Sequence, residues 1–189
     1  MTPETTWLLL RAAGLVALAA LTLSVASGLA GPAITRPAWR GVSVAVHRAA
    51  ALVGLGLTLA HVVLAVLDPY VAIDALAAVV PGVSAWEPLW VGAGALAVDA
   101  LAVVALTSAV RRQGPRVWWT LHVLTYPAWI LATGHALAVG SDVLRGPYPI
   151  VGVAGLLLVG VALVARVTAV RGGAPAGPAP VPVLTRSQP

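Results

Sequence analysis

Residues 44–67 read VAVHRAAALVGLGLTLAHVVLAVL, and this stretch decides the fold class. A helix crosses the apolar core of a bilayer with about 20 mostly apolar residues, because each residue adds about 1.5 Å of length. Such a helix also pairs its backbone N–H and C=O groups within the segment, as lipid requires. The stretch therefore predicts a transmembrane helix. It contains two histidines, His47 and His61, although ionisable side chains are costly within a membrane.

Four other stretches of the chain have the same apolar character. Of the 189 residues, 60% are hydrophobic and 9% are charged, whereas about a quarter of the residues are charged in a typical soluble domain. We therefore predict an all-α integral membrane bundle of five helices within residues 1–171. A disordered cytoplasmic tail, 172–189, rich in Pro, Ala and Gly, should follow it. The expected spans are Trp7–Ala30, Val44–Leu67, Leu89–Val110, Val117–Val139 and Ile150–Val170.

A shorter apolar stretch, Val71–Val80, lies between the second and third expected spans. It has about ten residues, which is too few to cross a bilayer. Pro69 and Pro81 bracket it and would end any helix there. We interpret this stretch as an interfacial or re-entrant cap.

The positions of arginine predict the orientation, since cytoplasmic loops of membrane proteins have an excess of positive residues. Arginines gather in the first and third connections and just after the last span, whereas the second connection is acidic. We therefore expect the N-terminus outside the plasma membrane and the C-terminus in the cytoplasm. This topology also explains the net charge of +5 without nucleic acid as a partner. The residues are Arg36, Arg40, Arg111, Arg112, Arg116 and Arg171 inside, and Asp68, Asp74 and Glu87 outside.

Four histidines, all within expected spans, are the candidates for chemistry. His47 and His61 are fourteen positions apart on the second span, and His122 and His135 are thirteen positions apart on the fourth. Fourteen residues make nearly four helical turns, so the first two share a face and lie roughly 21 Å apart along the axis. The second and fourth spans run parallel, which sets His47 level with His122 and His61 level with His135. We predict two facing pairs at two depths of the membrane.

The spacing on the fourth span fits an ideal helix less well, since thirteen positions rotate two side chains by about 140°. A tighter, partly 3₁₀ winding would bring the two histidines back to one face. We expect Pro127, which lies between them, to cause such a distortion.

Two facing imidazoles suit haem iron better than other metals. Zinc usually takes three or four ligands at one point, whereas haem iron takes two axial ligands on opposite sides of a flat apolar disc. The chain has no cysteine, which excludes thiolate zinc sites, iron–sulfur clusters and covalent c-type haem. Gly54 lies midway between His47 and His61, so it leaves that face bare between the two levels. It could equally serve helix packing alone.

The histidine pattern resembles that of the ferric reductase-like transmembrane domain, which ferric reductases and NADPH oxidases share. That family has histidine pairs on two helices at spacings of 14 and 13, and this chain reproduces both spacings in order. The resemblance covers roughly residues 7–170. Three short segments also resemble bacterial members of the family: Asp68–Tyr70, Trp118–His122 and His135–Asp142.

The resemblance implies transmembrane electron transfer through two non-covalent, bis-histidine haems b between the second and fourth helices. His47 and His122 would hold the inner haem iron, and His61 and His135 would hold the outer one. The family also has an arginine near the outer haem, on the helix before the first histidine helix, and Arg11 occupies that place. Arg11 would pair with a haem propionate there, although it could also snorkel to water.

The resemblance implies a partner as well. Oxidase-type members continue into flavin and nicotinamide domains, whereas this chain has no such domains after its fifth expected span. It resembles the isolated membrane subunits, which are oxidoreductase components. Its electrons would come from a separate cytoplasmic flavoprotein with FAD or FMN and NAD(P)H. The acceptor at the outer face would be a ferric chelate, dioxygen or a redox protein.

Two other interpretations stay open. The chain could be the haem subunit of a quinol-linked or methionine sulfoxide repair system, which the identity of a partner would decide. It could instead be a transporter without haem, in which the histidines and Asp99, in the middle of the third span, relay protons. Asp99 also has a structural alternative, a hydrogen bond to a neighbouring helix.

Overall fold

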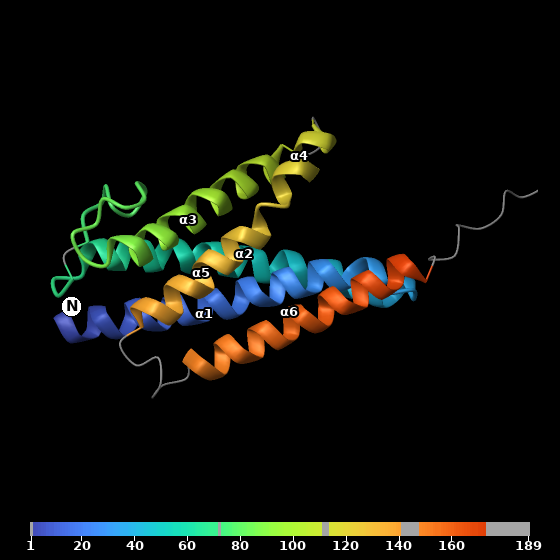
Figure 1. Cartoon of the computed structure of the whole chain (residues 1–189), viewed down its shortest axis with the longest axis horizontal. Helices are drawn as coiled ribbons and strands as arrows, with labels where there is room; N and C mark the ends of the chain where they lie inside the picture. Colours follow the sequence, from blue (N-terminus) through green and yellow to red (C-terminus); the bar gives the residue numbers. More distant parts are fainter. Residues whose placement is uncertain (1, 72, 111–113, 141–147, 173–189) are drawn as a thin grey trace, which may run out of the picture.

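The computed structural model describes residues 2–71, 73–110, 114–140 and 148–172, and Figure 1 shows them as a bundle of helices. No β-strand occurs in these residues, which confirms the expected all-α fold. The expected disordered tail lies outside the described residues, apart from Gly172. The elements are α1 (Pro3–Ala30), the short 3₁₀ helix η1 (Gly31–Ala33), α2 (Pro37–Leu67), α3 (Pro88–Ala109), α4 (Pro115–His122), α5 (Thr125–Val139) and α6 (Tyr148–Arg171).

Proline sets the start of several of these helices. It occupies one of the first two positions of α1, α2, α3 and α4. An N–H at such a position has no intrahelical acceptor in any case, and the fixed φ of proline matches the helix. At the start of α1, Thr2 Oγ1 also accepts a hydrogen bond from Thr5 N at 3.3 Å. The local sequence therefore determines where these helices begin.

Within the described residues, four helices are long and apolar enough to cross a membrane: α1 with η1, α2, α3 and α6. Their most apolar windows have mean hydropathies of 2.1 to 2.5, and they contain four of the expected spans almost entirely. Large side chains such as Leu52 and Ile150, each 73% exposed, cover their outer surfaces, as expected of residues that face lipid. The chain is thus a multi-pass membrane protein.

The expected fourth span, Val117–Val139, differs from the prediction because it consists of two helices. The first, α4, has 8 residues and ends at His122, and the second, α5, has 15 residues and begins at Thr125. Neither is long enough to cross a bilayer by itself. The described residues therefore contain four candidate spanning helices instead of five, and a fifth crossing by α4 and α5 together stays a prediction.

Proline causes the break between α4 and α5. In a regular helix the carbonyl of Val123 would accept a hydrogen bond from the residue at 127, but Pro127 has no N–H. Tyr126 N donates to Val123 O instead, at 3.1 Å, and Leu124 N donates to Leu121 O at 3.0 Å. Both bonds connect residues three apart, which is the 3₁₀ pattern. The tight winding expected between the two histidines of this segment is thereby confirmed.

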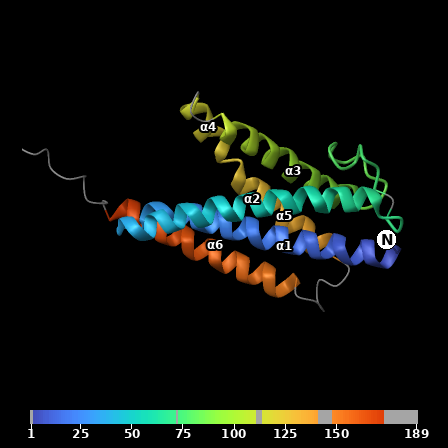
Figure 2. The same cartoon turned by 180° about the vertical axis from the view of Figure 1, so that it is seen from behind.

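The helices form two layers, and α1 belongs to the first. In the first layer, α1 packs against α2 and α6, and in the second, α3 packs against α4 and α5. The layers meet where α5 contacts α1 and α6. Figures 1 and 2 both show α3 diverging from α2 toward its α4 end. Within the described residues, α2 has no comparable packing with α3, α4 or α5, so it is held apart from the second layer.

Small residues let the packed backbones approach closely. A Cβ added at Gly54 of α2 would lie 2.8 Å from Cδ2 and 3.3 Å from the backbone N of Leu21 in α1. Gly54 therefore faces α1, and of its two interpretations the structure supports helix packing. Buried alanines serve the same purpose on α1, α3 and α5: Ala17, Ala26, Ala95, Ala97 and Ala128.

A buried hydrogen bond connects the two layers. Trp129 Nε1 on α5 donates to Thr22 Oγ1 on α1 at 2.8 Å, and both residues are less than a tenth exposed. The Thr22 hydroxyl in turn donates to Leu18 O at 2.7 Å. A buried indole N–H needs such an acceptor in apolar surroundings. The bond fixes α5, one of the helices with a histidine, against α1.

The two ends of the bundle differ in charge. The N-terminus and the α2–α3 connection lie at one end, and the α1–α2 turn, α4 and the end of α6 lie at the other (Figures 1 and 2). Apart from Arg11, the charges described at the first end are acidic and those at the second end are basic, as the orientation prediction requires. The acidic residues are Glu4, Asp68, Asp74 and Glu87, and the basic ones include Arg36, Arg40, Arg116 and Arg171.

Replacement of Thr22 by valine should destabilise the bundle, because valine keeps the volume and leaves the buried N–H of Trp129 without an acceptor. The free energy of unfolding should fall by about 1–2 kcal/mol, the range expected for an interhelical hydrogen bond in a membrane and for an unpaired buried donor. Reversible unfolding in mixed micelles measures this loss. Thr168→Val is the control, since the exposed Thr168 donates only to carbonyls of its own helix. Equal losses in both variants would contradict the prediction.

Candidate cofactor site

The structure brings the four histidines together as two facing pairs. The ring centres of His47 and His122 are 6.0 Å apart, and those of His61 and His135 are 6.2 Å apart. The ring planes are inclined by 67° in the first pair and by 84° in the second. Each pair joins α2 to the α4–α5 segment, so the pairing expected from the sequence is confirmed.

Backbone carbonyls of neighbouring helices orient three of the four rings. A carbonyl oxygen only accepts hydrogen bonds, so the Nδ1 atom beside it must have the proton and donate. In a neutral imidazole the lone pair is then free on Nε2, which is the form in which histidine binds a metal. The three bonds run from His47 Nδ1 to Ser24 O (2.8 Å), from His61 Nδ1 to Leu10 O (3.0 Å) and from His135 Nδ1 to Trp90 O (2.8 Å).

A glycine lies one helical turn after each carbonyl that accepts one of these bonds. In an α-helix the C=O of a residue points toward the residue four positions later, so a side chain there would obstruct a ring that approaches the carbonyl. A Cβ added at each of the three glycines would lie 2.8 to 3.1 Å from the Nδ1 atom of the histidine. The imidazole therefore fills the space that the missing side chain leaves. The pairs are Leu10 with Gly14, Ser24 with Gly28, and Trp90 with Gly94.

His122 is the exception. Its Nδ1 atom is buried and has no hydrogen bond from the described residues, and its ring lies against Trp118, with 4.9 Å between ring centres and 35° between planes. On α3, Ser108 follows Gly94 at the same sequence spacing at which Gly28 follows Gly14 on α1. The Oγ atom of Ser108 accepts a hydrogen bond from Trp118 Nε1 at 3.2 Å.

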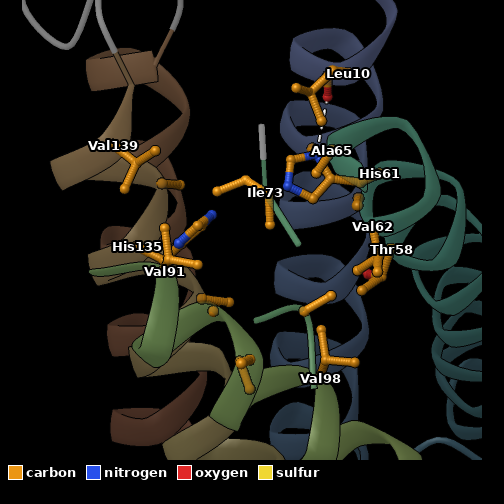
Figure 3. A pocket seen from close by; sticks show the side chains of 18 of the residues that line it. Leu10, Thr58, His61, Val62, Ala65, Ile73, Val91, Val98, His135 and Val139 are labelled. Atoms are coloured by element: carbon orange, nitrogen blue, oxygen red, sulfur yellow. Dashed lines mark hydrogen bonds between the residues drawn. The ribbon is translucent and has the colours of Figure 1, made fainter. Parts of the chain in front are cut away.

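A cavity of about 360 Å³ lies between His61 and His135. Figure 3 shows the two rings on opposite sides of it, pointing toward one another. Its walls come from α1, α2, α3, α5 and the connection before α3, and most of the lining side chains are apolar. Ile73 and Ala77 of that connection line the cavity, so the stretch interpreted as a cap does cover it. The space suits a flat apolar group with two axial nitrogens.

Two charged residues also line this cavity, Arg11 and Asp68. The guanidinium carbon of Arg11 is 4.5 Å from the centre of the Trp7 ring, a cation–π contact. Arg11 follows Leu10, whose carbonyl orients His61, and its side chain lines the same cavity as His61 and His135. Its bond to a propionate stays a prediction. Asp68 is 2% exposed, and its Oδ1 accepts a hydrogen bond from Tyr70 N at 3.4 Å.

Asp99 and Gly54 do not belong to the lining of this cavity. Asp99 is half-buried on α3, and no hydrogen bond joins its carboxyl group to another described residue. No contact of Asp99 among the described residues therefore supports either of its expected roles, the proton relay or the hydrogen bond to a neighbouring helix. Gly54 faces Leu21 of α1, as described above.

The donor set fits haem iron. A bond from a metal to an imidazole nitrogen is about 2 Å, and the ring centre lies about 1 Å beyond the nitrogen, so two axial imidazoles have centres about 6 Å apart. Both pairs have this separation. Within the described residues, no three side chains from among His, Cys, Asp and Glu gather at one point, as a zinc site would usually need. Two ligands per level suit the axial positions of haem.

Sequence reasoning found the four histidines but missed the glycines against which three of them lie. A signal for two of the glycines was present in the spacing. Gly14 and Gly28 have the same separation in the sequence as His47 and His61 on the neighbouring antiparallel helix. Matched spacings on adjacent helices indicate repeated contacts at two levels.

A family comparison agrees with the histidine pattern. The profile of the family described as "Ferric reductase like transmembrane component" matches residues 13–133. The matched residues include most of α1, all of α2, α3 and α4, and three of the four histidines. No curated protein and no solved structure matches the chain.

Replacement of Gly14 by alanine should displace the His61 ring, because the new Cβ would lie 2.8 Å from two of its atoms. Loss of the bond to Leu10 should weaken cofactor binding at the outer pair by about 10- to 100-fold, as for other residues that orient metal ligands. The haem content of the purified variant, titrated with free haem, measures this. Gly56→Ala is the control, since a Cβ there meets nothing within 4 Å. Wild-type haem affinity in Gly14→Ala would show that the contact has no role.

Proposed function

The chain belongs to the family of ferric reductase-like transmembrane components, and on that premise we propose that it transfers electrons across a membrane through two haems b. One observation supports this most strongly. The same arrangement, two imidazoles facing each other with their centres about 6 Å apart, occurs at two levels of the bundle. A single level would make one cofactor site, whereas two levels make a path from one face of the membrane to the other.

In this proposal His47 and His122 hold the inner haem, and His61 and His135 hold the outer haem. The iron of each haem would supply reversible one-electron chemistry. The protein provides the axial nitrogens, excludes water with apolar walls and fixes the rings through the Nδ1 bonds. Arg11, at the edge of the outer cavity, would pair with a haem propionate.

Electrons would enter at the arginine-rich end of the bundle. That end would face the cytoplasm, with the N-terminus outside the plasma membrane, because positive residues favour the inner side. Haem exchanges single electrons whereas NAD(P)H gives a hydride, so a flavin must divide the electron pair. We assign that FAD or FMN to a separate cytoplasmic flavoprotein. The basic end of the bundle suits an acidic docking surface on such a partner.

The outer haem would pass the electron to an acceptor at the other face. A ferric chelate, dioxygen or a redox protein would serve, and a quinol-linked or methionine sulfoxide repair system is the alternative within the same chemistry. A haem-free proton relay has less support. Such a relay needs both nitrogens of each ring, but the Nδ1 atoms of His47, His61 and His135 already donate to backbone carbonyls.

The purified protein, loaded with excess haem, should contain two non-covalent haems per chain, because each histidine pair holds one. His122→Ala and His135→Ala should each lose one haem and keep the other. Haem extracted with acidified acetone and measured against protein concentration gives the ratio. A ratio of one or zero in the loaded wild-type protein would refute the two-haem proposal.

The topology follows from the segregation of charge between the two ends. A reporter enzyme that works only in the cytoplasm should be active when it is fused after Arg171. A tag placed before Glu4 should be cleaved by protease added outside intact cells. The opposite pattern, a protected N-terminus with an accessible C-terminus, would mean that the orientation is inverted.

A further inference from the structure

A buried carboxyl group lies in the wall of the outer cavity. Asp68 follows the last residue of α2 and is 2% exposed. Among the described residues that line the cavity, it is the only acidic one. Its Oδ1 atom accepts the hydrogen bond from Tyr70 N at 3.4 Å, whereas its Oδ2 atom is buried and has no hydrogen-bond partner among the described residues. One oxygen of this carboxyl group therefore has no partner in the part of the chain that the structure describes.

The stability of the fold does not explain a carboxylate at this position. Burial of a charge without a partner is unfavourable. The C-terminus of a helix is also the negative end of the helix dipole, so an acidic residue at the end of α2 is unfavourable for a second reason. Buried polar groups without partners are rare, and a redox role or a bound group is among their explanations. The place of Asp68 in the cofactor cavity points to such a role.

We propose that Asp68 lowers the reduction potential of the outer haem. The inference rests on the proposed haem function. Reduction adds one electron to the ferric iron, which removes one positive charge from the haem, and no bond or proton is transferred. The negative charge of Asp68 therefore stabilises the ferric form more than the ferrous form. Apolar walls strengthen this effect, because they screen a charge much less than water does. Asp68 thus makes the outer haem a stronger reductant toward an acceptor at the outer face.

The effect should be largely confined to the outer level. Asp68 follows His61 by seven residues and His47 by twenty-one, which correspond to about 10 Å and about 30 Å along the axis of α2. At an effective dielectric constant of about 20, a unit charge shifts a one-electron equilibrium by about tenfold at the shorter distance and by less than about threefold at the longer one. Arg11 also lines the cavity and acts in the opposite direction, but it stays in place when Asp68 is replaced.

Asp68→Asn tests the proposal, because asparagine keeps the volume and an oxygen that can accept the bond from Tyr70 N. The haem-loaded protein is titrated with dithionite in the presence of redox mediators, and the absorption spectrum gives the ferric-to-ferrous ratio at each potential. This ratio should change by about tenfold at the outer haem, which raises its midpoint potential by about 59 mV. Asp68→Ser, which is also neutral, should raise the potential too. Asp68→Glu keeps the charge and should not.

Asp74→Asn is the matched control. Asp74 Oδ1 accepts a hydrogen bond from Leu76 N at 2.9 Å, the same local pattern as in Asp68 and Tyr70. Asp74 is exposed, however, and does not line the cavity. Because water and salt screen an exposed charge, its replacement should change the ratio by less than about twofold.

Two histidine variants assign the shift to one haem. His122→Ala should keep only the outer haem, and Asp68→Asn should raise the potential in this background by the full amount. His135→Ala should keep only the inner haem, and there the ratio should change by less than about threefold. Equal shifts in the two backgrounds would overturn the proposal, because the charge would then not act on the outer cavity.

The other outcomes separate this inference from the proposed function. An outer-haem potential that does not rise in Asp68→Asn and Asp68→Ser, or that rises as much in Asp74→Asn, would overturn the role of Asp68 and leave electron transfer through two haems intact. A loss of unfolding free energy in Asp68→Asn without a shift in potential would mean that the carboxyl group has a structural role only. A protein that takes up no haem at all would refute the proposed function itself.

Discussion

The hydrogen bond from an imidazole Nδ1 to a backbone carbonyl of the neighbouring helix is the interaction on which this structure depends. A helical carbonyl already accepts one bond within its own helix, and its second lone pair is reachable only where no side chain stands in the way. Glycine one turn later meets that condition at Gly14, Gly28 and Gly94. The same bond determines which nitrogen has the proton, so Nε2 is left free to bind iron.

This interaction also explains the division into two layers. Each helix with an anchored histidine lies close to a helix that supplies a glycine, α2 beside α1 and α5 beside α3. The free nitrogens then point away from these contacts, toward the space between the layers. The bond from Trp129 to Thr22 joins the layers at one place, and α2 stays apart from the second layer. The two close packings thus leave room for a flat group between them.

Much of the helical fold and of the histidine pairing could be predicted from the sequence, because a chain in lipid must pair its backbone N–H and C=O groups within its own helices. Length and hydropathy predicted four of the spanning helices, although α2 begins at Pro37 and not at Val44, and the spacing of the histidines predicted their pairing. The missing N–H of Pro127 predicted tight winding, but whether this would bend one helix or divide it depends on packing, which periodicity does not report. The role of Gly54 was ambiguous for the same reason. A helix face without a side chain at this position could pack against α1 or line the space for the cofactor. The unpaired Nδ1 of His122 could be found only from the structure, because the sequence does not show which acceptors lie within reach of a ring.

Electron transfer across a sealed membrane tests the central claim most directly. Vesicles that contain the haem-loaded protein enclose ferricyanide, which does not cross lipid, and dithionite is added outside. The account predicts that enclosed ferricyanide is reduced by the wild-type protein, and that His122→Ala and His135→Ala, each with one level of the path removed, reduce it at least about tenfold more slowly. Vesicles without protein give the background rate. Reduction at the wild-type rate by either variant would contradict a path through two histidine pairs.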